Sequence, residues 1–177
     1  MIRIFNKTTL LCALALLCAG ALASCHTSKK HVSHPGKPHF EEIRLGHASK
    51  KQRRVVEEAY SWLGTPYKYA ASEKGKATDC SGMVMKVYEK VTGLKLPRNS
   101  AKQAEFCDDM DAGEVVTGDL VFFATGKDPE KISHVGIVVD SESFIHASAS
   151  KGVVVSKFAN NYYQRTFKKF GRVPQSK

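Results

Sequence analysis

The sequence has no apolar run long enough for an ordinary transmembrane helix, which needs about 20 apolar residues. Its N-terminal run, 8–23, is shorter, follows two basic residues and ends in the tetrapeptide LASC at 22–25. This order is typical of a secretory signal with a lipobox, in which small residues precede a cysteine that is acylated before cleavage. We therefore predict a signal peptide at 1–24 and a lipid anchor on Cys25.

The later part of the chain lacks a basic excess, although the whole sequence carries a net charge of +10. Residues 1–54 hold ten lysines and arginines against two acids, whereas 55–177 hold seventeen against fifteen. A basic groove for nucleic acid is therefore not expected. The segment 25–50 has few apolar residues, two prolines and five of the seven histidines, which predicts a flexible tether. One globular domain is expected at 51–177.

Cysteine is also scarce, with five in the sequence and none in a Cys-x-x-Cys pair. Two lie in the predicted signal and a third is the predicted anchor, which leaves Cys80 and Cys107 in the domain. An exported chain could join them in a disulfide, but this would consume a thiol placed at a helix start, as argued below. We expect both cysteines to be free.

The predicted elements of the domain place helices before strands. A helical stripe of apolar residues starts after Lys51 and is ended by Gly64, and a loop then leads to a second helix. A short third helix is expected after Asn99 or Ser100 as its cap. Short β-branched and aromatic segments predict strands at 118–125, 134–140, 143–149, 153–157 and 167–173. Helices followed by strands predict an α+β domain with an antiparallel sheet of five to six strands.

The second predicted helix has a cysteine at its start. In TDCSGMVMKVYEKVTG, 78–93, the apolar residues have helical spacing and Gly93 is placed to end the helix. Cys80 therefore lies at a helix N-terminus, where free N–H groups and the positive end of the helix dipole favour a thiolate. We expect a reactive thiol that alkylates at mildly acidic pH, and ask where its base lies.

The only two histidines of the domain, His134 and His146, fall in neighbouring predicted strands. In an antiparallel hairpin, the numbers of two facing residues add up to a nearly constant value, which is set by the position of the turn. A turn centred near residue 140 gives a value close to the sum for His134 and His146. The two rings are therefore expected on one face of one hairpin, directly opposite or slightly offset, within hydrogen-bonding reach. Such a pair is typical of a base and its orienting residue, although each could also be a half-buried histidine bound to backbone.

A zinc site is a competing interpretation, because cysteine and histidine are also metal ligands. It would have only three candidate ligands and would need an acid such as Asp119 as the fourth. Since the chain offers no compact ligand pair, we favour the nucleophile and expect no metal and no cofactor.

The motifs LGTPYKY, DCSGMV, LPRNSAKQ, GDLVFF, SHVGIVV and FIHASASKGV, in this order over about 110 residues, resemble the NlpC family of cell-wall cysteine peptidases, whose domain is a trimmed papain-like fold. The resemblance implies that Cys80 is the nucleophile, His134 the general base and His146 the polar third member. It also implies that five residues line the substrate cleft, namely Tyr67, Asp79, Ser81, Arg98 and Ser100.

These cleft residues also have structural explanations. Asp79 and Ser81 could cap the helix, Tyr67 could pack its ring, and Arg98 could pair with an acid. The sequence AASEKGKA replaces the loop that is common in the family after the tyrosine, and no SH3-like domain accompanies the catalytic one, so subsite preferences are not carried over.

The resemblance implies hydrolysis of amide bonds in peptidoglycan stem peptides or cross-links, either D-Ala–diaminopimelate or γ-D-Glu–diaminopimelate. An acyltransferase on the same fold and a non-catalytic wall-binding lipoprotein are the alternatives. His26 follows the lipidated cysteine at the position where an aspartate would favour inner-membrane retention. We therefore expect an anchor in the outer membrane that faces the periplasm. We also expect the protein to be a monomer.

Overall fold

The computed structural model describes residues 40, 43 and 45–174. The predicted signal peptide, Cys25 and most of the predicted tether lie outside the described residues. The chain divides into two compact units, and all described residues belong to the second, Gly36–Lys177. Among the described residues, no helix combines the length and the apolar character that crossing a membrane requires.

Helix α1, Lys50–Tyr60, opens the domain. Ser49 caps it, because its hydroxyl accepts from the backbone N–H of Gln52 while the Gln52 side chain accepts from the backbone N–H of Ser49. The predicted helix is correct in place, but its stripe extends too far. The chain leaves the helix after Tyr60 and turns at Gly64, whose φ is 77°, so that Leu63 is exposed.

Helix α2, Cys80–Thr92, begins and ends where the sequence predicts. Asp79 is its N-cap, and Gly93, with a φ of 75°, ends it in the left-handed conformation that glycine adopts without a steric cost. Helix α3, Ser100–Phe106, is capped by Asn99, whose side chain accepts from the backbone N–H of Lys102. This selects Asn99 over Ser100 as the cap.

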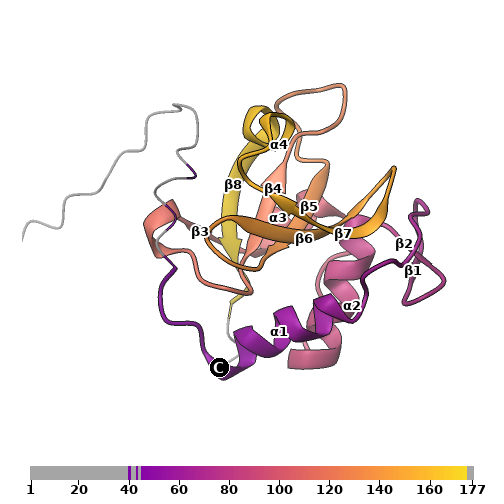
Figure 1. The fold of residues 1–177 in the computed structure, drawn as a ribbon, viewed down its shortest axis with the longest axis horizontal. Helices are drawn as coiled ribbons and strands as arrows, with labels where there is room; N and C mark the ends of the chain where they lie inside the picture. Colours follow the sequence, from indigo (N-terminus) through magenta and orange to yellow (C-terminus); the bar gives the residue numbers. More distant parts are fainter. Residues whose placement is uncertain (1–39, 41–42, 44, 175–177) are drawn as a thin grey trace, which may run out of the picture. The chain divides into compact units, whose positions relative to one another are not determined.

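The strands form a six-stranded antiparallel sheet in the order β3-β8-β4-β5-β6-β7. Figure 1 shows this sheet with α1 and α2 on one side and α4 at the far end of the strands. The α+β class and the antiparallel sheet that the sequence predicts are therefore confirmed. The bounds are β3 Asp108–Met110, β4 Leu120–Phe123, β5 His134–Val138, β6 Ser143–Ser148, β7 Gly152–Lys157 and β8 Phe167–Arg172.

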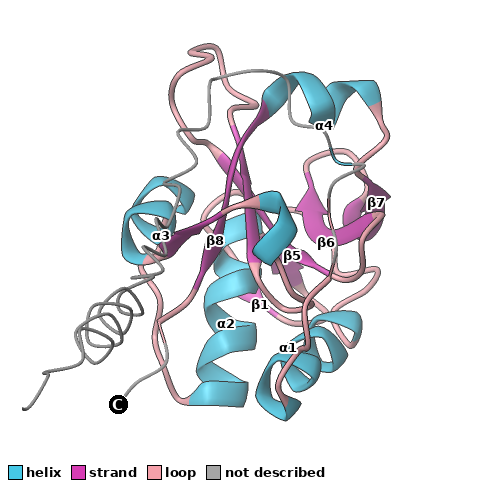
Figure 2. Ribbon diagram, turned by 90° about the vertical axis from the view of Figure 1, so that its left-hand side faces the viewer, coloured by secondary structure: helices cyan, strands magenta, loops and turns pink. Residues whose placement is uncertain are grey.

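Both faces of the central strands are buried. Along β4, Leu120 and Phe122 pack in the cluster that includes α1 and α2, whereas Val121 and Phe123 pack in a second, phenylalanine-rich cluster. Helix α2 contacts β5 and β6, and Figure 2 shows α1 and α2 together beneath the strands. The start of α2 is thereby held against the sheet.

Five short elements were not predicted from the sequence. A hairpin of two-residue strands, β1 Ser72–Glu73 and β2 Ala77–Thr78, lies in the loop before α2. The others are β3, which pairs only with β8, the 3-10 helix η2, Ala112–Glu114, and helix α4, Asn161–Thr166. These segments are too short to carry a periodic pattern, and tertiary contacts hold them.

Candidate active site

Cys80 is the first residue of α2 and its side chain lies against β5. The capping carboxylate of Asp79 accepts from the backbone N–H of Gly82 at 2.7 Å, which fixes the first turn. Backbone N–H groups of Val135, Ser81 and Cys80 itself act on the sulfur and lower the thiol pKa. Since Val135 follows His134 in β5, the structure brings the predicted nucleophile beside the strand that carries the predicted base.

Burial decides the resting state of this thiol. Cys80 is 7% exposed, and the burial raises its thiol pKa to about 11, against the lowering by the N–H groups and with a smaller raising by the Asp79 charge. This shift runs against the sequence-based expectation of a resting thiolate at mildly acidic pH. The helix start acts in the expected direction, but desolvation is the larger effect.

The two histidines meet as the hairpin arithmetic predicts, with an offset. Strand β5 pairs with β6 so that Ile137 faces Ile145 and Val138 faces Phe144. This register places His134 and His146 diagonally on one face, and Nε2 of His134 lies 2.8 Å from Nδ1 of His146. The rings are nearly perpendicular, at 86°.

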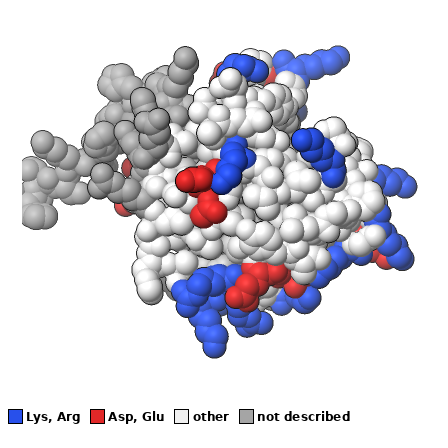
Figure 3. Space-filling model, in the orientation of Figure 1, with Lys and Arg blue, Asp and Glu red and all other residues white. Residues whose placement is uncertain are grey.

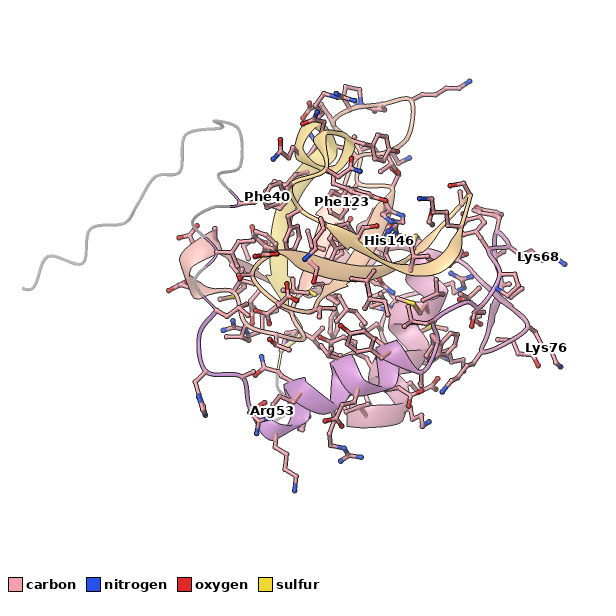
Figure 4. All side chains as sticks on the ribbon, in the orientation of Figure 1. Phe40, Arg53, Lys68, Lys76, Phe123 and His146 are labelled. Carbon is pink, nitrogen blue, oxygen red and sulfur yellow. The ribbon has the colours of Figure 1, made fainter. Side chains whose placement is uncertain are left out.

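Both imidazoles are neutral at physiological pH. Burial lowers the pKa of His134 to about 4, and burial together with the neighbouring His134 lowers that of His146 to about 3. His146 is 1% exposed, and Figure 4 shows its side chain inside the domain, whereas Lys68 and Lys76 extend outward. A neutral His134 has one ring nitrogen free to accept a proton.

Three of the predicted cleft residues form one hydrogen-bonded group. Arg98 binds Asp79 with two bonds of 2.8 and 2.9 Å, and also donates to the Ser81 hydroxyl at 3.0 Å. Burial raises the pKa of the Asp79 carboxyl. Arg98 and the N–H groups of Gly82 and Ala70 lower this pKa by more than burial raises it, so the net shift is downward. The group therefore holds a carboxylate at the cap of the helix that begins with Cys80, and it combines the capping and ion-pair explanations that the sequence left open.

The two remaining predicted cleft residues, Tyr67 and Ser100, lie on separate segments. Tyr67 is half-buried and forms an isolated bridge with Thr78, two residues before Cys80, and burial raises its pKa, with smaller raising contributions from the charges of Cys80 and Asp79. Ser100 is buried at the start of α3. A role of either residue in substrate binding stays a prediction.

Two residues that the sequence analysis did not single out contact His146. Its Nε2 lies 2.9 Å from Oγ of Ser156 on β7 and 3.2 Å from the hydroxyl of Tyr163 on α4. Strand alternation could have indicated Ser156, because β6 and β7 form a hairpin with Phe144 facing Ser156. Tyr163 comes from the unpredicted helix and carried no signal.

The competing zinc interpretation requires an acid such as Asp119 beside Cys80 and the two histidines. Among residues 40, 43 and 45–174, no group of three histidine, cysteine or acidic side chains is placed to hold a metal ion. Asp119, the proposed fourth ligand, instead binds Arg172 at 2.7 and 2.9 Å. Cys107 is a second free, buried thiol at the end of α3.

The surface of the described domain carries both positive and negative charges. On the face drawn in Figure 3, lysines and arginines lie near acids along the lower edge, and a further acidic patch adjoins a basic side chain above that edge. Ion pairs such as Lys90–Glu58 at 2.7 Å and Lys86–Glu89 at 2.8 Å account for part of this mixture.

Comparison with known proteins identifies the family of the chain. The model of the NlpC/P60 family matches residues 64–172. The chain is 43% identical over 107 residues to the probable endopeptidase NlpC of Escherichia coli K12, covering 60% of this chain and 68% of that protein. It is 34% identical over 120 residues to the E. coli K12 protein named murein DD-endopeptidase MepS/murein LD-carboxypeptidase, covering 68% of this chain and 62% of that one.

Solved structures agree. The chain matches the crystal structure of a protein of Staphylococcus aureus described as similar to lipoprotein, NLP/P60 family, with a TM-score of 0.64 and 27% identity. The match covers 73% of this chain and 43% of that one, so the present chain spans less than half of that protein. With a family model that matches most of the described domain and relatives above 30% identity, the chain belongs to the NlpC/P60 family.

Proposed function

We propose that the protein is a cysteine endopeptidase that hydrolyses amide bonds in peptidoglycan peptides. One observation carries the proposal, namely that Cys80 at the start of α2 lies against β5, whose first residue, His134, is hydrogen-bonded to His146. A thiol, a neutral imidazole and a polar residue that orients it are the parts that thiol-based acyl transfer needs. The relatives named murein endopeptidases support peptidoglycan as the substrate.

In the proposed reaction, the sulfur of Cys80 attacks the amide carbonyl while His134 accepts the thiol proton. Because both groups are neutral at rest, the proton moves as the carbon–sulfur bond forms and the charge passes to the carbonyl oxygen. The backbone N–H of Cys80, at a helix start, stabilises that oxygen. The His134 imidazolium then protonates the leaving amine, and water hydrolyses the thioester.

The test is digestion of purified sacculi with separation of the released muropeptides by mass spectrometry. Cys80→Ala and His134→Ala are each expected to abolish release of new products, and the double variant to be no worse, because members of one catalytic unit act non-additively. His146→Ala is expected to have a milder effect. The products identify whether D-Ala–diaminopimelate or γ-D-Glu–diaminopimelate bonds are cut.

Matched controls separate the alternatives. Cys107→Ala removes the other thiol of the described domain and should keep full activity, since Cys107 lies at the end of α3 next to Gly171 of β8, which is two strands away from β5 in the sheet. Substantial hydrolysis by Cys80→Ala would refute the nucleophile assignment. Transfer of an acyl group without hydrolysis would favour the acyltransferase, and sacculus binding without either reaction would favour the binding protein.

We further propose that residues 1–24 are a lipoprotein signal peptide and that Cys25 anchors the domain 51–177 through the tether 25–50 to the outer membrane, facing the periplasm. The LASC motif and the position of His26 support this proposal. In cells fed labelled palmitate, the wild-type protein should carry label in the outer-membrane fraction. Cys25→Ser should carry none, because only a thiol forms the thioether, and label on that variant would contradict the lipobox.

A further inference from the structure

His146 is held at both ring nitrogens. Its Nδ1 lies 2.8 Å from Nε2 of His134, and its Nε2 lies 2.9 Å from Oγ of Ser156 and 3.2 Å from the hydroxyl of Tyr163. A neutral imidazole has one N–H donor and one acceptor nitrogen, so the bond at one nitrogen determines what the other can do. The hydroxyls of Ser156 and Tyr163 therefore bear on the proton positions of both histidines.

The proposed reaction allows only one arrangement of these protons. Since Nε2 of His134 faces His146, Nδ1 is the nitrogen that remains to accept the proton of Cys80. Nε2 of His134 must then carry its proton and donate to Nδ1 of His146. His146 in turn must carry its own proton on Nε2, where it needs an acceptor.

The opposite tautomer of His146 would prevent the reaction. A proton on Nδ1 of His146 would face Nε2 of His134 and force the proton of His134 onto its Nδ1. His134 could then accept nothing from Cys80. Either tautomer keeps the bond between the two rings, so this bond alone does not select the productive one.

Two separate elements supply the acceptors at Nε2. Ser156 lies on β7, where it faces Phe144 and so shares a sheet face with His146. Tyr163 comes from α4, and its ring packs edge-on against His146 with centroids 5.4 Å apart and against Phe144 at 4.9 Å. Because His146 is 1% exposed, bulk water does not replace these hydroxyls.

We propose that Ser156 and Tyr163 are positioning residues whose hydroxyl oxygens accept the Nε2 proton of His146 and thereby hold His134 in the tautomer that can act as base. This proposal rests on the proposed function, because the proposed reaction is what requires the Nε2–H tautomer of His146, whereas the NMR test below measures the tautomer independently of activity. Both hydroxyls contact His146, and they act on Cys80 only through the two rings. Loss of both removes the only protein acceptors that the described residues offer to Nε2 of His146.

The direct test is the nitrogen-15 NMR spectrum of the histidine rings, recorded without substrate between pH 7 and 8. In the wild type we expect the Nε2–H tautomer for both His134 and His146. In the double variant Ser156→Ala/Tyr163→Phe we expect His146 to shift partly or fully to Nδ1–H. An Nδ1–H tautomer of His146 in the wild type, or an unchanged Nε2–H tautomer in the double variant, would overturn the proposal.

Kinetics on soluble muropeptides give the second readout. The double variant is expected to lose about tenfold or more in kcat with little change in KM, because the hydroxyls orient the base and do not bind substrate. Either single variant should lose less, since one hydroxyl remains. Ser156→Thr, which keeps a hydroxyl, should retain the tautomer and most of the rate.

The matched control is Tyr162→Phe, which removes a hydroxyl from the adjacent, 45% exposed residue of α4. It should change neither the spectrum nor kcat. Equal losses in Tyr162→Phe and Tyr163→Phe would show a general effect on α4 and overturn the assignment. If the wild type hydrolyses no muropeptide, the proposed function fails, while the NMR spectra still decide the tautomer.

Discussion

At the scale of single residues, the reactivity of Cys80 is determined by two opposing effects. The helix start stabilises a thiolate, and burial raises the thiol pKa to about 11. Alkylation by iodoacetamide requires the thiolate, so its rate should rise continuously as the pH increases from 5 to 9, without the acidic plateau of a preformed ion pair. Peptide mass spectrometry after timed labelling measures this rate.

Cys107 provides the internal control for that experiment. Burial raises its thiol pKa to about 12, so it should label more slowly than Cys80 at every pH. His134→Ala should change Cys80 labelling little, because the neutral imidazole contributes no charge at rest. Fast labelling of Cys80 at pH 5 to 6 that disappears in His134→Ala would instead demonstrate a thiolate–imidazolium pair and contradict the neutral resting site.

The sequence predicted the positions of Cys80, His134 and His146 better than their protonation states. Helical spacing placed Cys80, and strand arithmetic placed His134 and His146 within one register step. The ion pair of Arg98 with Asp79 could not be derived, because it joins residues on separate loops. Protonation states depend on how completely the folded chain excludes water, which no local pattern encodes.

At the scale of elements, Gly82 determines how closely α2 approaches the loop before it. A Cβ at this position would meet the carbonyl oxygen of Ala71 well inside van der Waals distance and lie 3.0 Å from Cβ of Ser72. Helix propensity favours alanine over glycine by about 1 kcal/mol, so the two effects oppose one another. We expect the steric contact to outweigh the helix propensity, because the atom it would meet belongs to the backbone of Ala71.

Gly82→Ala is therefore expected to destabilise the fold by about 1–3 kcal/mol and to reduce turnover, since the helix start that carries Cys80 must shift. Urea unfolding and muropeptide hydrolysis measure the two effects. Gly113→Ala is the control, because a Cβ there would meet no atom within 4 Å. A Gly82→Ala protein more stable than the wild type would show that helix propensity outweighs the steric contact.

Gly82 also shows where element-level prediction ends. The partner of a small residue near a helix start is not written in the sequence: Gly82 faces the loop at Ala71, and Gly136 is the glycine whose absent side chain makes room beside Phe144 and His146. Long, periodic segments such as α2 and the strands from β4 to β8 were predictable. The β1–β2 hairpin and α4 were not, because pairing and packing with distant residues maintain them.

At the scale of the whole molecule, the partly buried His134 and the buried His146, both neutral, make the fold sensitive to acid. Burial lowers the pKa of His134 to about 4 and that of His146 to about 3, whereas an unfolded histidine titrates near 6.5. The unfolded chain therefore binds more protons below that value. The stabilisation is complete above about pH 6.5 and is lost progressively as the pH falls toward the folded-state values.

Asp79 contributes in a lower pH window. Its net pKa shift is downward, through Arg98 and backbone N–H groups acting against burial, so its contribution is present above the ordinary carboxyl pKa and is lost as the pH falls below it. The loss between pH 6.5 and 5 consequently belongs to the histidines. The same burial that keeps His134 a base thus limits the pH range in which the domain is stable.

The free energy of unfolding is therefore expected to fall between pH 6.5 and 5 by up to about 1.4 kcal/mol per pH unit for each histidine. Urea unfolding followed by circular dichroism at pH 8, 7, 6 and 5 measures it. The double variant His134→Gln/His146→Gln keeps polar side chains of similar size that do not titrate, and its stability should be nearly constant over this range. A wild-type protein as insensitive to pH as this variant would show that the two rings become protonated in the folded state, and would remove the basis for a neutral His134 as the base that activates Cys80.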